Sequence, residues 1–181
     1  MNDARQLPGD ADARARVERI IRVDHAGEYG AARIYAGQLA VLGRSDKAGL
    51  LRHMLEQEQQ HLEKFSELVV RRRVRPTAML PLWHLAGFAL GAATAALGEK
   101  AAFACTAAVE EVIDEHYAAQ IAALEDRDPA LTAAVEDFRA DEAAHRQTAL
   151  AQGAQQAPGY KLLSETIKAG CRLAIKLSER I

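Results

Sequence analysis

Residue types that bind metal ions recur in this chain with one spacing, a single glutamate followed by a Glu-x-x-His pair. The glutamate of the pair lies 30 residues after the single one in the first copy and 32 residues after it in the second. Residues three positions apart share a face of an α-helix, so each pair can direct two ligands to one point. Four carboxylates and two imidazoles on four facing helices form the ligand set of a di-iron or di-manganese centre. The candidate ligands are Glu28, Glu58 and His61 in the first copy, and Glu110, Glu142 and His145 in the second.

One Glu-x-x-His pair alone would be weak evidence, because 27% of the residues are charged and such a pair also arises on a solvated helix face. Two copies with matched spacing argue against that interpretation. The sequence around Glu28 and Glu110 is rich in small residues, which let helices approach closely. A carboxylate buried there without a partner is costly, and a cation supplies the partner. Carboxylates and imidazoles suit iron, and four carboxylates balance two divalent ions.

The composition predicts one helical domain over residues 13–181. A chain of 181 residues can bury a sizeable core, and aromatic residues (5%) and prolines (five) are few. Net charge is −2, which argues against nucleic acid as a partner. Cys105 and Cys171 lie in apolar surroundings without a Cys-x-x-Cys spacing, which predicts reduced thiols. Residues 1–12 are polar and lack the apolar core of a signal peptide, which predicts a disordered N-terminus and a cytoplasmic location.

Apolar periodicity predicts the elements that would position the ligands. The expected helices are about 13–43, 47–72, 99–125, 129–152 and 160–179, with a loop over 153–159. The first four place the candidate ligands on their apolar faces as two helical hairpins, joined by a long crossover. This layout is typical of a ferritin-like four-helix bundle, which the last helix would cap.

Two tyrosines and one histidine lie near the single glutamates in the sequence. Tyr35 and Tyr117 each follow a single glutamate by seven residues, on the same helix face. Ordinary core tyrosines and groups that hydrogen-bond near the metals are both open interpretations. His116 follows Glu110 by six residues and is rotated away from it, which places it no closer than a second layer around the metals.

Residues 76–98 contain no charged side chain and follow a basic cluster, Arg71–Arg75, that contains four arginines. From Pro81 to Leu97 the apolar helix has 17 residues, or about 25 Å, which is at the lower limit for crossing a bilayer. Trp83 and the basic cluster favour a helix that lies in the membrane interface. A buried core helix and a self-association surface are the alternatives. The spacing Gly87-x-x-x-Gly91 indicates close helix packing.

Longer motifs accompany the ligand spacing. They are RVDHAGEYGA (22–31), RIYAGQ (33–38), RVRPT (73–77), PLW (81–83), GFALGA (87–92), AVEE (108–111), AGCR (169–172) and LSER (177–180). Through them, nearly all of the chain after about residue 17 resembles the demethoxyubiquinone hydroxylase family of ubiquinone biosynthesis.

The resemblance implies a di-iron monooxygenase that hydroxylates the ring of a demethoxyubiquinol-type polyprenyl quinone. It implies two iron ions, O₂ as co-substrate and NADH as the electron source. The family's ligand roles fall on the same six residues, and a family His-Tyr pair that serves electron transfer falls on His116 and Tyr117. The family's association with membranes implies a peripheral position on the cytoplasmic face, through residues 76–98 and the Arg71–Arg75 cluster. A lipid-binding partner protein or a homo-oligomer is also expected.

Three other functions are open at this point. A ferroxidase or iron-storage protein would share the ligands but would not need an uncharged helix beside an arginine cluster. A hydroxylase of a modified tRNA base would need a basic groove, which the charge pattern does not provide. A non-catalytic, membrane-associated scaffold would bind no stoichiometric iron.

Overall fold

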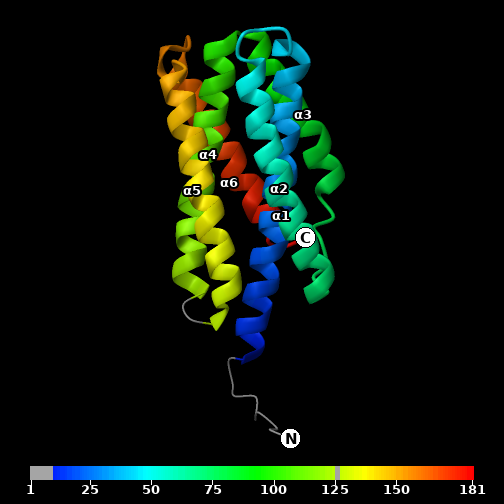
Figure 1. The fold of residues 1–181 in the computed structure, drawn as a ribbon. Helices are drawn as coiled ribbons and strands as arrows, with labels where there is room; N and C mark the ends of the chain where they lie inside the picture. The colour runs from blue at the N-terminus through cyan, green and yellow to red at the C-terminus, as the bar shows by residue number, and fades with distance from the viewer. Residues whose placement is uncertain (1–9, 125–126) are drawn as a thin grey trace, which may run out of the picture.

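Helices account for all of the regular structure that this computed structural model describes, over residues 10–124 and 127–181; of residues 10–12 only the backbone is described. The long helices run along one common direction (Figure 1). In chain order, the elements are α1 (Asp10–Leu42), α2 (Ala48–Arg72), α3 (Leu80–Ala96), α4 (Glu99–Leu124), α5 (Pro129–Ala151), the 3-10 helix η2 (Ala154–Gln156) and α6 (Tyr160–Ser178). The predicted all-helical class is confirmed.

Most helix bounds lie within one residue of the sequence-based expectation. α1 begins at Asp10, inside the segment 1–12 that was expected to be disordered, and residues 1–9 lie outside the described residues. The expected end of the fourth helix, residue 125, also lies outside them. The loop 153–159 contains η2, and Gly153 and Gly159 have φ angles of 87° and 66° that favour glycine. Cys105 and Cys171 are free, as predicted.

Two helical hairpins, α1–α2 and α4–α5, form the bundle. One apolar cluster closes it at one end and includes Ile21, Phe65, Tyr117 and Val135. A second cluster at the other end includes Tyr35, Met54, Ala107 and Ala149. On each of the four helices, the candidate ligands lie between a residue of the first cluster and a residue of the second. The fold therefore holds the six candidate ligands in the middle of the bundle, between the two apolar clusters.

The crossover helix α3 packs closely on α1, because glycines line the contact. A Cβ atom on Gly87 would lie 2.8 Å from the carbonyl oxygen of Gly30, and one on Gly37 would lie 2.8 Å from the backbone nitrogen of Ala92. Both separations are closer than real Cβ contacts. The predicted role of the Gly-x-x-x-Gly spacing in helix packing is confirmed. α6 packs on α4. Ile167 of α6 belongs to a small buried apolar cluster, and Leu90 of α3 packs against the same cluster.

The outer face of α3 is apolar and exposed. Leu85 is 69% exposed and Leu97 is 70% exposed, so α3 is not a buried core helix. Trp83 does not share that face fully, since its Nε1 donates a 3.0 Å hydrogen bond to Ser178 Oγ on α6. None of the described helices is both long and apolar enough to pass through a membrane.

The arginines of the Arg71–Arg75 cluster differ in exposure and in their partners. Arg71, Arg73 and Arg75 are exposed, whereas Arg72 pairs with Asp128 through both of its terminal nitrogens. Arg72 therefore ties the end of α2 to the start of α5 and is not available to a membrane. Asp128 also accepts a 3.2 Å hydrogen bond from the backbone nitrogen of Leu131, which makes it the N-cap of α5.

Replacing Asp128 by alanine should lower the free energy of unfolding at pH 7 by about 1–2 kcal/mol, because both the cap and the ion pair are lost. Asp128→Asn keeps the cap and should lose only the smaller, ionic part. The hydrogen bond from Arg72 lowers the pKa of Asp128. Its stabilisation is therefore complete above the unfolded-state pKa of about 3.9 and is lost as the pH falls below it. Denaturant unfolding at pH 7 and pH 3 checks this: the difference in stability between wild type and Asp128→Asn should be smaller at pH 3 than at pH 7.

Candidate metal centre

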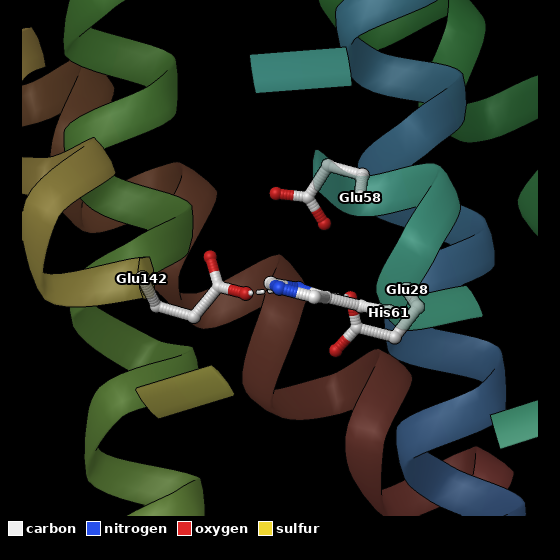
Figure 2. A group of neighbouring side chains, drawn as sticks. All are labelled: Glu28, Glu58, His61 and Glu142. Carbon is white, nitrogen blue, oxygen red and sulfur yellow. Dashed lines mark hydrogen bonds and ion pairs between the residues drawn. The ribbon is translucent and has the colours of Figure 1, made fainter. Parts of the chain in front are cut away.

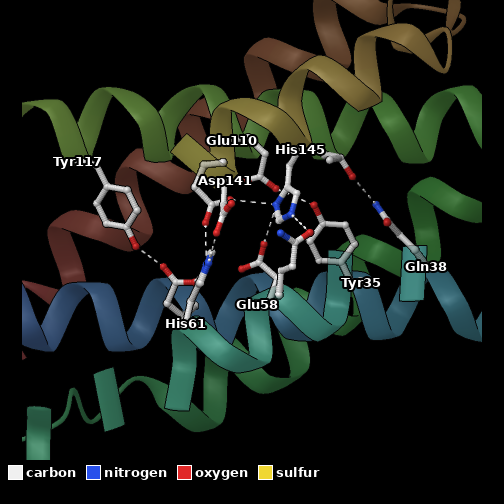
Figure 3. A network of polar contacts seen from close by, with 12 residues as sticks. Tyr35, Gln38, Glu58, His61, Glu110, Tyr117, Asp141 and His145 are labelled. Carbon is white, nitrogen blue, oxygen red and sulfur yellow. Dashed lines mark hydrogen bonds and ion pairs between the residues drawn. The ribbon is translucent and has the colours of Figure 1, made fainter. Parts of the chain in front are cut away.

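The structure brings all six candidate ligands together in the middle of the bundle. Each of them is at most 3% exposed. Glu28 comes from α1, Glu58 and His61 from α2, and Glu142 from α5, and in Figure 2 these four side chains converge from the two hairpins. Glu110 on α4 and His145 on α5 complete the set, beside Glu58 (Figure 3).

The ligand atoms form two overlapping groups, each small enough to surround one ion. Within each group the ligand atoms lie within 4.8 Å of one another. The groups are Glu28, Glu58, His61 and Glu142, and Glu58, Glu110, Glu142 and His145. Glu58 and Glu142 belong to both groups. This arrangement could hold two cations, with two shared carboxylates between them and one further Glu–His pair on each side.

Both imidazoles present the same nitrogen to the carboxylates. His61 Nδ1 lies 3.1 Å from Glu142 Oε1, and His145 Nδ1 lies 3.2 Å from Glu142 Oε2. The other nitrogen of each ring contacts the opposite hairpin. His61 Nε2 is 3.1 Å from Asp141 Oδ2, and His145 Nε2 is 3.1 Å from Gln57 Oε1. These outer contacts fix the rings so that Nδ1 is the nitrogen free to bind a metal.

Burial and mutual repulsion strongly perturb the carboxyl groups. Burial raises the pKa of Glu58 well above its usual value, and the charges of Glu142 and Glu28 raise it further. Burial and then Glu142 do the same to the pKa of Glu110. Burial opposes the charge of His61, but hydrogen bonds to Glu142 and Glu28 outweigh it and raise the pKa of His61 to about 10. The site thus concentrates negative charge that only a proton or a cation can neutralise.

Several carboxylate oxygens at this site are buried without a hydrogen-bond partner. They are Glu28 Oε2, both oxygens of Glu58, and Glu110 Oε2. Leaving a buried charged acceptor unsatisfied is costly, so a set of four converging acceptors points to a ligand that is absent from the protein chain itself. A pair of divalent cations fits this donor set, since the oxygens and imidazole nitrogens are the ligand types that iron accepts.

Each tyrosine supports the single glutamate of the other hairpin. Tyr35 Oη donates a 2.9 Å hydrogen bond to Glu110, and Tyr117 Oη donates one to Glu28 (Figure 3). Both tyrosines are 1% exposed. His116 contacts none of the six ligands and instead lies 2.8 Å from Gln120 Nε2. The structure therefore brings Tyr35 and Tyr117 to the site and places His116 outside it.

Sequence reasoning missed the residues that precede each Glu-x-x-His pair, Gln57 and Asp141, which hold the histidines. It also missed a glutamine ten residues after each single glutamate, Gln38 and Gln120, although both lie on inward faces. The signal was available in the sequence, because the +7 tyrosine and the +10 glutamine recur at the same offsets in both hairpins. Which group each one contacts depends on the other hairpin, and no spacing within one helix reveals that.

Asp141, which contacts His61, is charged, whereas Gln57, which contacts His145, is neutral, so we expect their replacement to weaken metal binding unequally. Asp141→Ala should weaken metal binding by roughly 10- to 100-fold, because the charge-assisted contact to His61 raises the basicity of the ring. Gln57→Ala should have a smaller effect, since its contact to His145 is neutral. Competitive titration with a chelator measures both affinities. Equal effects, or none for Asp141→Ala, would contradict this role for the carboxylate.

Comparison with known proteins agrees with this geometry. Residues 15–178 match the family described as ubiquinone biosynthesis protein COQ7. The chain is 57% identical over 177 residues to 3-demethoxyubiquinol 3-hydroxylase of Rhodospirillum rubrum, covering 97% of this chain and 84% of that one. It is 53% identical to the human NADPH-dependent 3-demethoxyubiquinone 3-hydroxylase, mitochondrial (95% and 81% covered), and 41% identical to the yeast 5-demethoxyubiquinone hydroxylase, mitochondrial (95% and 81%). The family expected from the helix motifs is thereby confirmed: this chain belongs to the COQ7 family of ubiquinone biosynthesis proteins.

Proposed function

We propose that this protein is a di-iron monooxygenase that hydroxylates the ring of a demethoxyubiquinol-type polyprenyl quinone in ubiquinone biosynthesis. The observation that carries the proposal is the pair of overlapping, buried Glu/His groups that share Glu58 and Glu142. The substrate follows from the relatives, whose names specify a demethoxyubiquinol or demethoxyubiquinone. The same names favour hydroxylation over the ferroxidase alternative.

Six residues of this chain hold the metals in the proposal. Glu28 and His61 would hold one iron and Glu110 and His145 the other, while Glu58 and Glu142, which belong to both groups, would serve both. When bound, the irons supply the redox chemistry and the open positions that activation of O₂ requires.

The protein's own residues orient the ligands and exclude water. Tyr117 and Tyr35 hold the single glutamates by hydrogen bonds, so each carboxylate keeps one oxygen for the metal. Asp141 and Gln57 fix the imidazoles. The apolar clusters at both ends of the bundle keep bulk water from the reacting groups.

Electrons come from a reduced nicotinamide cofactor. The sequence resemblance implied NADH, whereas the names of the human and mouse relatives specify NADPH. Parallel reactions with the two cofactors distinguish them.

The protein acts as a peripheral enzyme on the cytoplasmic face of the membrane that contains the quinone. A polyprenyl tail is almost insoluble in water, and the exposed leucines of α3, together with Leu162 on α6 (77% exposed), offer an apolar surface to lipid. Arg71, Arg73 and Arg75 lie next to this surface in the chain and favour anionic headgroups. A lipid-binding partner protein or a second copy of this chain would compete for the same face.

The test is iron content paired with product analysis, using protein expressed in iron-supplemented medium and a demethoxyquinol, O₂ and NADH or NADPH. Two irons per chain with hydroxylated product would support the proposal. Two irons without product would overturn the substrate and favour a ferroxidase. Absence of stoichiometric metal would overturn the di-iron centre itself.

Flotation with anionic liposomes tests the membrane position. A Leu82→Glu/Leu85→Glu variant should lose most of its binding, because both side chains are exposed on α3. Val41→Glu is the matched control, since Val41 is an exposed apolar residue at the far end of α1. Loss of self-association, rather than of flotation, would assign the α3 face to a homo-oligomer.

A further inference from the structure

A buried polar cluster outside the metal ligands connects the interior of the bundle to its surface. Gln120 Nε2 on α4 lies 2.6 Å from Asp24 Oδ1 on α1 and 2.8 Å from His116 Nε2 on α4. The Asp24 side chain is 0% exposed, whereas that of His116 keeps 20% of its exposure. The second oxygen of Asp24 is buried without a hydrogen-bond partner. The cluster thus starts at solvent and ends at an unsatisfied carboxyl oxygen, one helical turn before Glu28.

The internal repeat of the fold provides a comparison. Glu28 and Glu110 are equivalent positions, so Asp24 corresponds to Thr106, His116 to Ile34, and Gln120 to Gln38. In the equivalent group, Gln38 Nε2 donates to Thr106 Oγ1 (3.3 Å) and to the carbonyl oxygen of Ala102 (3.1 Å). Ile34, the equivalent of His116, is buried in an apolar cluster. A neutral hydroxyl therefore suffices to hold the glutamine. The titratable pair at the other end needs a different explanation, since burying a carboxyl group is costly.

The proposed reaction supplies that explanation, and the inference rests on it. Hydroxylation breaks a ring C–H bond and forms a C–OH bond with one atom of O₂, while the other atom leaves as water. This consumes two electrons and two protons. A reduced nicotinamide supplies both electrons and one proton, so at least one further proton must come from solvent in each turnover. The ligands are at most 3% exposed, so a proton that does not arrive on the substrate has to cross the protein.

We propose that His116, Gln120 and Asp24 form the route by which protons pass from solvent toward the metal ligands. His116 exchanges protons with water at the surface. Gln120 Nε2 donates to both His116 Nε2 and Asp24 Oδ1 and holds these two atoms 3.8 Å apart. When the imidazole takes up a proton at Nε2 it can no longer accept from Gln120, and a rotation of the ring lets this N–H donate to Asp24 instead. Asp24 then releases the proton toward Glu28, one helical turn further along α1.

The electrostatic surroundings agree with these roles. Burial raises the pKa of Asp24 well above its usual value, and the nearby charge of Glu28 adds to this, while the hydrogen bond from Gln120 opposes it. Burial lowers the pKa of His116, and the charge of Glu179, just after the end of α6, opposes this. Tyr117 is the other titratable group that the charge of Asp24 affects. A carboxyl group that readily holds a proton and an imidazole that readily releases one suit transfer between them.

The test measures proton uptake during chemical reduction of the iron-loaded protein, without quinone, using a pH indicator in a stopped-flow instrument. Asp24→Asn keeps the shape and the contact to Gln120 but cannot carry a proton, so uptake should be slower by roughly 10- to 100-fold at unchanged iron content. Thr106→Val, at the equivalent position of the other hairpin, should match the wild type.

Chemical rescue separates a proton route from a structural role. His116→Gly should also be slow, and added imidazole should restore its uptake but not that of Asp24→Asn. Wild-type uptake in Asp24→Asn, or no uptake by the wild type, would overturn the proposal. Because no quinone is present, a failure of the hydroxylase assignment would show only in the product assay and would leave this comparison interpretable.

Discussion

Replacing Glu58 by glutamine is expected to stabilise the metal-free protein and to destabilise the iron-loaded one. Glu58 is fully buried among three other carboxylates, and neither of its oxygens has a hydrogen-bond partner. A neutral amide of the same shape removes that repulsion. The free energy of unfolding of the metal-free variant should rise by about 1–3 kcal/mol.

With iron bound, the wild type should be more stable than Glu58→Gln, because Glu58 belongs to both ligand groups. A ligand present at 100 times its dissociation constant stabilises a protein by about 2.7 kcal/mol, and the variant forfeits most of this as its affinity falls. Hydroxylation should fall by at least a factor on the order of 100, more than loss of an outer contact to a histidine would cause. Iron content, product formation and thermal unfolding with and without iron measure these effects.

Glu63→Gln is the matched control, since Glu63 is exposed on the same helix. It should leave iron content and both unfolding temperatures unchanged. If Glu58→Gln lowered the stability of the metal-free protein, the carboxylate would have a structural role. If the variant bound two irons with full activity, Glu58 would not be a metal ligand.

The helices and the two hairpins could be predicted because each apolar stripe is a property of one helix. The candidate ligands lie on these stripes, and Glu28 and Glu110 precede the two Glu-x-x-His pairs at matched distances.

What could not be predicted depends on how one helix is rotated against another. Asp141 reaches His61 across the two hairpins, and Arg72 of the basic cluster turns to Asp128. Trp83 seemed a membrane anchor from its neighbours in the sequence, but its ring reaches Ser178, 95 residues away. Each of these contacts joins segments whose register is set only when the whole bundle packs.

The largest structural effect outside the metal site is expected from Gly91→Ala. A Cβ atom at this position would overlap the carbonyl oxygen of Ile34 and would lie 2.8 Å from its carbonyl carbon. These are backbone atoms of α1, so no side chain can rotate away, and α3 has to separate from α1. The free energy of unfolding should fall by about 3 kcal/mol, at the upper end of the range for overpacking, or roughly 6–12 °C in Tm.

The location of the damage can be read from the single tryptophan of the chain, Trp83, which lies on α3. In Gly91→Ala, tryptophan fluorescence should change at a lower denaturant concentration than the circular dichroism signal of the helices, because α3 detaches from α1 before the bundle unfolds. Gly170→Ala is the control of opposite sign: nothing lies within 4 Å of its Cβ position, so alanine should stabilise α6 by about 0.5–1 kcal/mol. Coincident transitions in Gly91→Ala at wild-type stability would mean that α1 and α3 tolerate a larger separation, and that the glycines do not determine how α3 is held.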